Sequence, residues 1–401
     1  MPVAPLEHLV PLPVPSEALP ERAAVAIIGG GIMGDQHRVP PGAGGRARRR
    51  ARGAGHGRLG SSAKPLGGIR ATFSDPGNIQ LGQRSLEAFE RFDAEFGTDI
   101  EAATGGLPVP VSDTRTRPTR WPRARRSRTA SAATRGSSRP ARPRPFQPYL
   151  DPQALVGASL LAQGRLRATG AGGRGIPQAA ARLGAGVCER TEVLGIGRAA
   201  GVHELHTTRG ALVADTIVIA AGAWSRRVGA MVGIDLPVEP LRRLIGVTAP
   251  LRPAPGDIPF TLDLSSTLYF HGAGDEALLV GISHPGQAAG FGRDFDHEWV
   301  PAFDEAAAVV APSLVGLSLV GGWAGLYEDT PDHNACIGRA EQVEGVLYAT
   351  GFSGHGFLQG PAVGELVRDL YLGRTPFLDP TPFGAARFGE RDARIRELHI
   401  I

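Results

Sequence analysis

The sequence contains little cysteine, few aromatic residues and no long apolar run. Its 401 residues include two cysteines, Cys188 and Cys336, so we expect neither a disulfide framework nor a cysteine-rich metal cluster, and we predict a reducing, cytoplasmic location. No stretch of eighteen or more apolar residues occurs, which excludes a predicted membrane-spanning helix. The proline-rich residues 1–21 lack a basic start, so we interpret them as a loose leader rather than as a secretory signal.

Acidic residues are missing from two segments. No Asp or Glu occurs between Asp35 and Asp75 or within residues 114–150, and the second segment holds eleven arginines and six prolines. Residues 35–178 carry 25 Lys and Arg against 10 Asp and Glu, whereas the rest of the chain carries 18 against 29. Such a split is typical of a nucleic-acid-binding arm or a disordered tail. Residues 114–150 contain no lysine and only three aromatic residues, which disfavours a nucleic-acid partner.

A short apolar run leads directly into a glycine-rich turn. Residues 24–28 (AVAII) are typical of a buried strand in a parallel sheet, and Gly29, Gly31 and Gly34 follow with the spacing of a dinucleotide-binding turn. The alternative is an ordinary glycine turn between a strand and a helix. The expected helix is not evident after Gly34, because two adjacent prolines occupy its interior. The acid that would bind a ribose about 20 residues later is also missing.

Periodicity and length predict further elements and two domains. Residues 211–220 are interpreted as two buried strands with a turn at Asp215. Helices are expected at 78–96, 299–309 and 362–371, and strands at 191–196, 244–248, 267–271, 277–283 and 346–349.

Five blocks occur in order along the chain. They are IIGGGIMG (27–34), GGIRATFSDPGNIQLGQRSLEAFERF (67–92), VIAAGAWS (218–225), GLYEDTPDHNACIG (325–338) and ATGFSGHGFLQGPAVGE (349–365). Together they resemble the D-amino-acid oxidase superfamily of flavoproteins, in particular its sarcosine oxidase, glycine oxidase and dimethylglycine dehydrogenase branch. The resemblance fails in residues 35–60 and about 107–178. Our hypothesis for these Arg-, Pro-, Ala- and Gly-rich segments is a pair of compensating frameshifts in GC-rich coding DNA.

The resemblance implies an α/β fold with a discontinuous Rossmann-like FAD-binding domain and a second, antiparallel-sheet substrate domain. We expect Tyr269 and Phe270 in the floor of the substrate domain. The predicted boundaries are 22–106, 186–239 and 323–385 for the FAD-binding domain, 107–185 for an atypical basic segment, and 240–322 for the substrate domain.

The resemblance also implies FAD as cofactor, with no metal. For Ser61 and Ser62 the alternative to FAD binding is an ordinary polar loop, and for Gly222 it is a plain turn between a strand and a helix. The expected FAD-binding residues are Gly29, Gly31, Gly34, Ser61, Ser62, Gly68, Val193, Ala221, Gly222, Trp224, Gly354, His355, Gly356 and Phe357.

The implied reaction oxidises the C–N bond of a small secondary or tertiary amino acid, similar to sarcosine, glycine or proline, by hydride transfer to flavin N5. Tyr327, His355 and Arg70 are the expected catalytic residues. Tyr327 resembles a tyrosine that lines the substrate pocket, although a packing role is the alternative. His355 either adds positive charge or holds its loop. Arg70, with Arg242 or Arg243, is a candidate for binding the substrate carboxylate.

Two departures from the monomeric sarcosine oxidases bear on mechanism. Gly325 stands where those oxidases have the cysteine that links the flavin, so we expect no cysteinyl bond. Leucines at 278–279 stand near the position of a lysine that helps oxygen react, which favours an electron carrier over O₂ as acceptor. Two other functions stay open: an inactive or FAD-deficient relative of the family, and a basic nucleic-acid-binding protein. Partner subunits also stay open.

Overall fold

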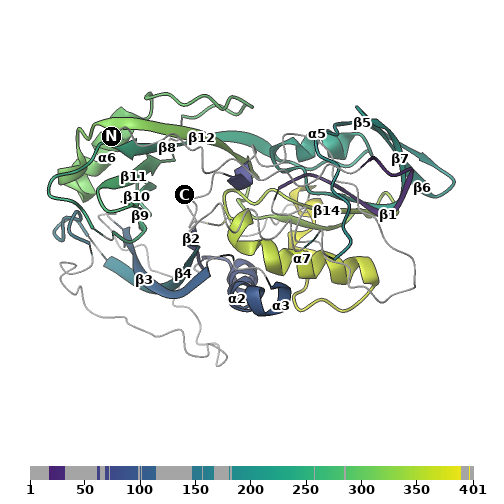
Figure 1. The fold of residues 1–401 in the computed structure, drawn as a ribbon, viewed down its shortest axis with the longest axis horizontal. Helices are drawn as coiled ribbons and strands as arrows, with labels where there is room; N and C mark the ends of the chain where they lie inside the picture. Colours follow the sequence, from purple (N-terminus) through teal and green to yellow (C-terminus); the bar gives the residue numbers. More distant parts are fainter. Residues whose placement is uncertain are drawn as a thin grey trace.

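The structure is a computed structural model, and Figure 1 shows two lobes with strand β12 running from one to the other. Gly34 and the acid-poor residues 35–60 and 114–146 lie outside the described residues. The described residues are 18–31, 61–63, 68–71, 73–97, 100, 102–113, 147–155, 157–166, 180, 183–256, 258–283, 286–389 and 397.

A mixed sheet of six strands forms the core of one lobe. Its order is β13-β14-β7-β6-β5, with β1 added parallel to β7, and β14 is also parallel to β7. Apolar clusters cover both faces of this sheet, which explains the continuous apolar composition of β1. The strands are β1 (Arg22–Ile28), β5 (Val193–Ala199), β6 (Val202–Thr207), β7 (Gly210–Ile219), β13 (Cys336–Arg339) and β14 (Val346–Thr350).

The turn predicted at Asp215 is wrong. Residues 210–219 form one uninterrupted strand, β7, which pairs with β1 from Val213 to Ile219. Asp215 occupies an outward-facing position of that strand, where its carboxylate forms an exposed ion pair with Arg22 of β1. Because alternate residues of a strand point to opposite faces, one outward aspartate needs no break in the strand.

The second sheet has eight strands and is antiparallel except for the β3–β9 pair. Helix α6 (Val300–Val310) packs on one face, over an apolar cluster that includes Leu244, Phe270 and Trp299. The strand order is β12 (Leu319–Asp329), β8 (Glu239–Thr248), β11 (Ala277–Ile282), β10 (Leu268–Ala273), β9 (Thr261–Asp263), β3 (Ala102–Asp113), β4 (Gly157–Leu166) and β2 (Gly68–Ile69).

These two sheets confirm the predicted α/β class with a second, mainly antiparallel domain. The domain boundaries stay a prediction, and hydrogen bonding now adds β2 and all of β12 to the second sheet. Strands β3 and β4, in and around the predicted atypical segment, also belong to that sheet.

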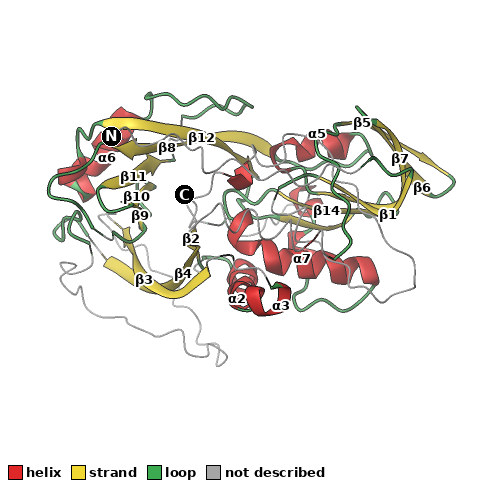
Figure 2. Cartoon of the chain, in the orientation of Figure 1, coloured by secondary structure: helices red, strands yellow, loops and turns green. Residues whose placement is uncertain are grey.

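Helices α2 (Pro76–Glu90) and α7 (Gly356–Leu372) lie side by side under the mixed sheet, as Figure 2 shows. The predicted helix at 78–96 breaks at Arg91, which separates α2 from α3 (Phe92–Phe96). The other short helices are α5 (Ser225–Ala230), η2 (Ser61–Ala63), η3 (Gly222–Trp224), η4 (Pro312–Leu314), η5 (Thr381–Phe383) and η6 (Ala385–Gly389). Among the described helices, none has the length and apolar character needed to cross a membrane.

Helix α7 begins six residues earlier than periodicity predicts and continues through Pro361. A proline inside a helix removes one hydrogen bond and crowds the preceding turn. Here the next amide, that of Ala362, donates to the Ser85 hydroxyl of α2 at 3.1 Å. A bidentate ion pair between Arg84 and Glu365, with two distances of 2.8 Å, adds a second link between these helices. Contacts with α2 therefore compensate for the proline.

The end of β1 makes a testable contact with the end of β7. Gly29 has φ 138°, and a Cβ there would lie 1.9 Å from the Ala220 carbonyl oxygen. We expect Gly29→Ala to lower the free energy of unfolding by at least about 3 kcal/mol, because both the backbone angle and the clash oppose alanine. Urea unfolding measures this change.

Gly195→Ala in β5 is the matched control. Nothing lies within 4 Å of a Cβ at Gly195 and its φ is not positive, so we expect a change within about 1 kcal/mol. Equal unfolding free energies for the two variants would contradict the close approach at Gly29.

Candidate active site

Glycine turns follow three neighbouring parallel strands at their carboxyl ends. β1, β7 and β14 lead into turns containing Gly29, Gly222 and Gly354, whose φ values are 138°, 56° and 94°. In open α/β sheets, ligands bind outside the carboxyl ends of the strands, where turns of this kind approach them. The structure thus collects three of the predicted turns at one edge of the mixed sheet.

Residues of the first turn contact the short helix η2. A Cβ at Gly31 would lie 2.9 Å from the Ser62 hydroxyl, so glycine allows these segments to meet. Ser61 of the same helix donates a hydrogen bond to the Leu326 carbonyl of β12. Both predicted serines therefore link the glycine turn to the strand that carries Tyr327. Gly34 lies outside the described residues.

Arg70 and His355 form a buried pair between the two lobes. Their Nη2 and Nε2 atoms are 3.3 Å apart, although the residues are 285 positions apart in sequence. Phe73 contacts both, with its ring centroid 4.9 Å from the Arg70 guanidinium and 5.0 Å from the His355 ring. Burial lowers the pKa of Arg70 to about 10, whereas Glu397 and Tyr327 oppose that fall. Arg70 therefore remains a cation at neutral pH.

Tyr327, on strand β12 of the second sheet, packs against the loop that carries Gly354 and His355. A Cβ at Gly354 would lie 2.5 Å from the Tyr327 ring, so the glycine lets the loop pack directly on the tyrosine. The Arg243 guanidinium lies 5.2 Å from the centroid of the same ring. Burial raises the pKa of Tyr327, while Arg243 and Arg70 oppose the rise. The phenol is therefore neutral at physiological pH and can donate a hydrogen bond.

Arg243 has donor capacity that the described part of the chain does not use. It pairs with Gly325 across β8 and β12, and its buried Nε has no partner among the described residues. Its neighbour Arg242, also predicted as a carboxylate ligand, forms an ion pair with Asp296 at 2.7 Å. Since adjacent strand residues point to opposite faces, only Arg243 shares the face of Tyr327.

Apolar side chains surround Arg243 on this face of the second sheet. Ile245 of β8 pairs with Trp323 of β12, at the next position on the same face of the sheet as Arg243. Tyr269 and Leu279 belong to the same cluster. The Tyr269 hydroxyl donates to the Leu244 carbonyl at 3.2 Å, and burial raises its pKa. Such a face suits a ligand that has one anionic group and an apolar part.

Glu328 is an ionisable residue of this region that the sequence did not single out. It follows Tyr327 and accepts hydrogen bonds from the Thr350 hydroxyl at 2.8 Å and the Gly351 amide at 3.1 Å. Burial raises its pKa to about 7, and these hydrogen bonds limit the rise. An acid at an interior strand position is a sequence signal for such a group, but its partners come from β14.

Other predicted cofactor residues have mainly packing contacts in the described structure. Val193 pairs with Thr207, and Gly68 pairs with Arg165 and has open space within 4 Å of the point that a Cβ would occupy. The Trp224 ring lies 5.3 Å from that of Phe291 and is 37% exposed. Ala221 is the N-cap of η3 and Gly356 the first residue of α7, while Phe357 stacks on Phe89. Their roles toward FAD stay predictions.

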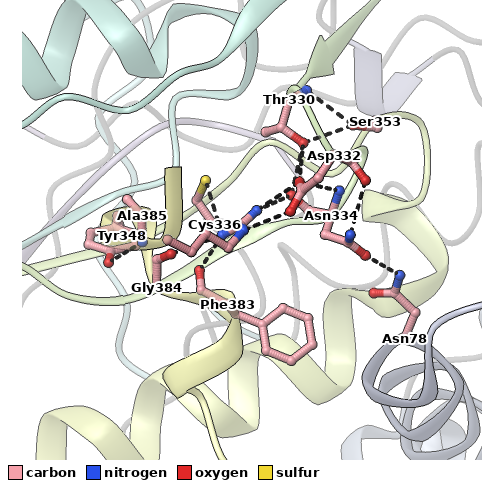
Figure 3. A network of polar contacts seen from close by, with 11 residues as sticks. Asn78, Thr330, Asp332, Asn334, Cys336, Tyr348, Ser353, Phe383, Gly384 and Ala385 are labelled. Carbon is pink, nitrogen blue, oxygen red and sulfur yellow. Dashed lines mark hydrogen bonds and ion pairs between the residues drawn. The ribbon is translucent and has the colours of Figure 1, made fainter. Parts of the chain in front are cut away.

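A buried polar network that the sequence did not reveal joins residues 330–334, which follow β12, to helix α2 and to the loop before α7 (Figure 3). Asp332 accepts two hydrogen bonds from the Arg387 guanidinium, at 2.8 and 3.0 Å. Asn334 accepts one from Asn78 of α2 at 2.8 Å, and Thr330 contacts Ser353. No local pattern reveals these contacts because they join residues far apart in sequence.

Comparison with known proteins assigns this arrangement to a family. The model of the family described as "DAO: FAD dependent oxidoreductase" matches residues 51–370. The chain belongs to this family. FAD is therefore the cofactor of the family to which the chain belongs, and relatives of the chain include amino-acid oxidases.

Curated relatives include glycine oxidases and N-methyl-L-tryptophan oxidases. The chain is 31% identical to the glycine oxidase of Geobacillus kaustophilus over 60% of its own length and 63% of that protein. It is 31% identical to the N-methyl-L-tryptophan oxidase of Salmonella heidelberg over 46% of its length and 51% of that protein. The matches thus span about half to two thirds of these relatives.

Solved structures agree with the fold over nearly the whole chain. The L-proline dehydrogenase from P. horikoshii aligns with a TM-score of 0.77 and 25% identity, covering 94% of this chain and 100% of that one. The glycine oxidase from Geobacillus kaustophilus aligns with a TM-score of 0.73 and 24% identity, again covering 94% and 100%. These likenesses confirm the two-domain fold expected from the resemblance.

The described residues fit the phosphate-bearing part of FAD. Gly29 and Gly31 leave no side chain over the end of β1, where a Cβ would collide with Ala220 or Ser62. Helix α7 begins at the same sheet edge, where the positive end of its dipole suits negative charge on the part of the cofactor beside His355. Residues 32–60, where a ribose-binding acid would be expected, lie outside the described residues. No group of three potential metal ligands occurs among the described residues.

Glu328 predicts a pH dependence of stability. Its pKa is about 7 in the folded protein against an ordinary value of 4.5, so the folded state binds more protons between these values. The contribution of this group to stability is therefore full below about pH 4.5 and is lost as pH rises through 7. As pH rises from 5 to 8, we expect the free energy of unfolding of Glu328→Gln to increase by about 2 kcal/mol relative to that of the wild type. This value is smaller than the full pKa shift implies, because partial solvent contact screens the charge.

Chemical unfolding of both proteins across this pH range measures the difference. Glu344→Gln, which changes a glutamate whose side chain is 90% exposed, is the matched control and should follow the wild-type pH profile. A constant difference between Glu328→Gln and the wild type would contradict the raised pKa.

Proposed function

We propose that the enzyme oxidises the C–N bond of a secondary or tertiary amino acid whose carboxylate binds Arg243. The observation that carries this proposal is the unused, buried donor of Arg243 beside Tyr327, on a face that is otherwise apolar. A carboxylate is the anionic group that a guanidinium binds with paired hydrogen bonds. Relatives named glycine oxidase and N-methyl-L-tryptophan oxidase support an amino acid as the substrate.

The chain's own residues would bind and orient this substrate. Arg243 would hold the carboxylate, and the neutral Tyr327 phenol would donate a hydrogen bond. Ile245 and Trp323 would exclude water from the apolar part. An apolar surrounding and nearby cations favour the neutral amine, which is the form that can release electrons. When bound, FAD supplies the acceptor for the hydride that leaves the carbon beside the nitrogen.

His355 and Arg70 would act on the cofactor side of the site. His355 is the N-cap residue of α7, and Arg70 lies 3.3 Å from its ring. A helix N-terminus together with a guanidinium stabilises negative charge that develops nearby. We propose that this pair stabilises the negative charge that develops on the cofactor side of the site while the substrate is oxidised. The acceptor that later removes the electrons stays open between O₂ and an electron carrier.

Visible absorption spectroscopy of the purified protein tests the proposal. A yellow protein whose absorbance is bleached anaerobically by sarcosine, L-proline or N-methyl-L-tryptophan would support it. A colourless protein that takes up no added FAD would favour the FAD-deficient alternative. A yellow protein that none of these amino acids reduces would contradict the proposed substrate class. Salt-sensitive binding to nonspecific DNA would instead favour the nucleic-acid alternative.

Arg243→Met tests the carboxylate ligand. The substitution keeps an apolar stem but removes the charge, and we expect KM for the best amino acid to rise about 10- to 100-fold, since a hydrogen bond to a charged group contributes about 1.5–3 kcal/mol. Steady-state kinetics measure the change. Arg242→Met is the matched control, because Arg242 pairs with Asp296 on the other face of the sheet. Equal effects of the two substitutions would contradict the role of Arg243.

A further inference from the structure

Glu397 lies beyond residues 51–370, the part that the family model matches, and yet it is completely buried. Its backbone amide donates to the Asp332 carbonyl at 3.0 Å. This contact anchors it beside the polar network of Figure 3, whose Asn78 also bonds to the Glu397 carboxylate. The residue therefore belongs structurally to the active-site region and not to a peripheral tail.

The Glu397 carboxylate accepts hydrogen bonds from several donors at the start of α2. The Ser74 amide and hydroxyl bind it at 2.9 and 2.6 Å, the Asp75 amide at 3.1 Å, and the Asn78 side chain at 3.0 Å. A carboxylate at a helix N-terminus also interacts favourably with the helix dipole. Buried charge-assisted hydrogen bonds of this kind define the position of the backbone that donates them.

That backbone is the segment between β2 and α2, which carries Arg70 and Phe73. Phe73 immediately precedes Ser74 and contacts both Arg70 and His355. Among the described charges, Glu397 also acts on Arg70 electrostatically and opposes the effect of burial on the pKa of Arg70. Glu397 thus influences Arg70 in two ways, by fixing the segment that bears it and by compensating its buried charge.

We propose that Glu397 is a positioning residue of the active site, whose carboxylate fixes the backbone of residues 73–78 so that Arg70 stays against His355. The inference rests on the proposed function only for its kinetic consequences. A simple structural role would be different: it would change stability without selective coupling to Arg70.

A matched pair of substitutions separates these roles. Glu397→Gln keeps the side-chain shape but removes the charge. Glu365→Gln breaks the bidentate pair with Arg84, which also joins helix α2 to the rest of the protein but makes none of the contacts of the Arg70 segment. With the best amino acid as substrate, we expect Glu397→Gln to lower kcat/KM by about 10-fold. We expect Glu365→Gln to lower it by less than about 2-fold. Equal effects in both variants would overturn the proposal.

A double-mutant cycle with Arg70→Met provides a readout that does not need turnover. If Glu397 acts on Arg70, the two substitutions are non-additive in the free energy of unfolding, whereas Glu365→Gln and Arg70→Met are additive. Additivity for Glu397 and Arg70 would overturn the proposal whatever the substrate. Non-additivity without oxidation of any amino acid would instead leave the inference standing and count against the proposed function.

Ser74→Ala is the milder second variant if Glu397→Gln does not fold. It removes the 2.6 Å hydroxyl contact and leaves the amide contacts of Glu397 in place. We expect a change in kcat/KM in the same direction but smaller, about 3-fold, and again non-additivity with Arg70→Met. No change in either measurement would overturn the proposal.

Discussion

The buried ion pair between Asp332 and Arg387 holds together the segments that form the site. Both side chains are only 8% exposed, and the guanidinium also donates to the carbonyls of Phe383 at 2.8 Å and Asn334 at 2.8 Å. A buried pair of this kind adds little net stability over an apolar packing, but loss of one partner costs about 3–5 kcal/mol because a charge is left alone. Its main effect is therefore to define one arrangement of the chain between β12 and β13.

That arrangement determines where the glycine loop before α7 lies. Thr330 bonds to the Asn334 carbonyl at 2.9 Å and contacts Ser353, while the Ser353 amide donates to the Glu328 carbonyl at 3.1 Å. On the other side, Asn334 binds Asn78 of α2. The loop that presents His355 and the segment that presents Arg70 are thus both attached to residues 328–334. The close approach of Arg70 and His355 is a consequence of this shared attachment.

Local chemistry made part of this structure predictable. The apolar composition of β1, the glycines after it and residues 354–357 indicate a strand, a tight turn and a helix start without reference to distant residues. The same local reasoning predicted a turn at Asp215, because the ion pair of Asp215 with Arg22 of the neighbouring strand is not visible in the local sequence.

Residues whose importance depends on remote partners were not predictable in this way. A glutamate is a residue type that is normally expected at the surface, so nothing local marks Glu397 as buried. Its hydrogen-bond donors lie 319 to 323 positions earlier in the chain. Arg242 and Arg243 are indistinguishable until the register with β12 and the ion pair with Asp296 separate them. Pairing between strands and long-range hydrogen bonds, rather than residue type, decide which charge reaches the site.

The residues proposed to recognise the substrate and the residues expected to bind the adenosine end of FAD come from different parts of the chain. Arg243 and Tyr327, which are proposed to bind substrate, and Arg70 and His355, which are proposed to act on the cofactor side, all lie outside residues 35–60 and 114–146 in the sequence. The adenosine end of FAD, in contrast, normally uses the helix and the acid that follow the first glycine turn. Changes in residues 35–60 would therefore affect the affinity for FAD before they affect the recognition of substrate.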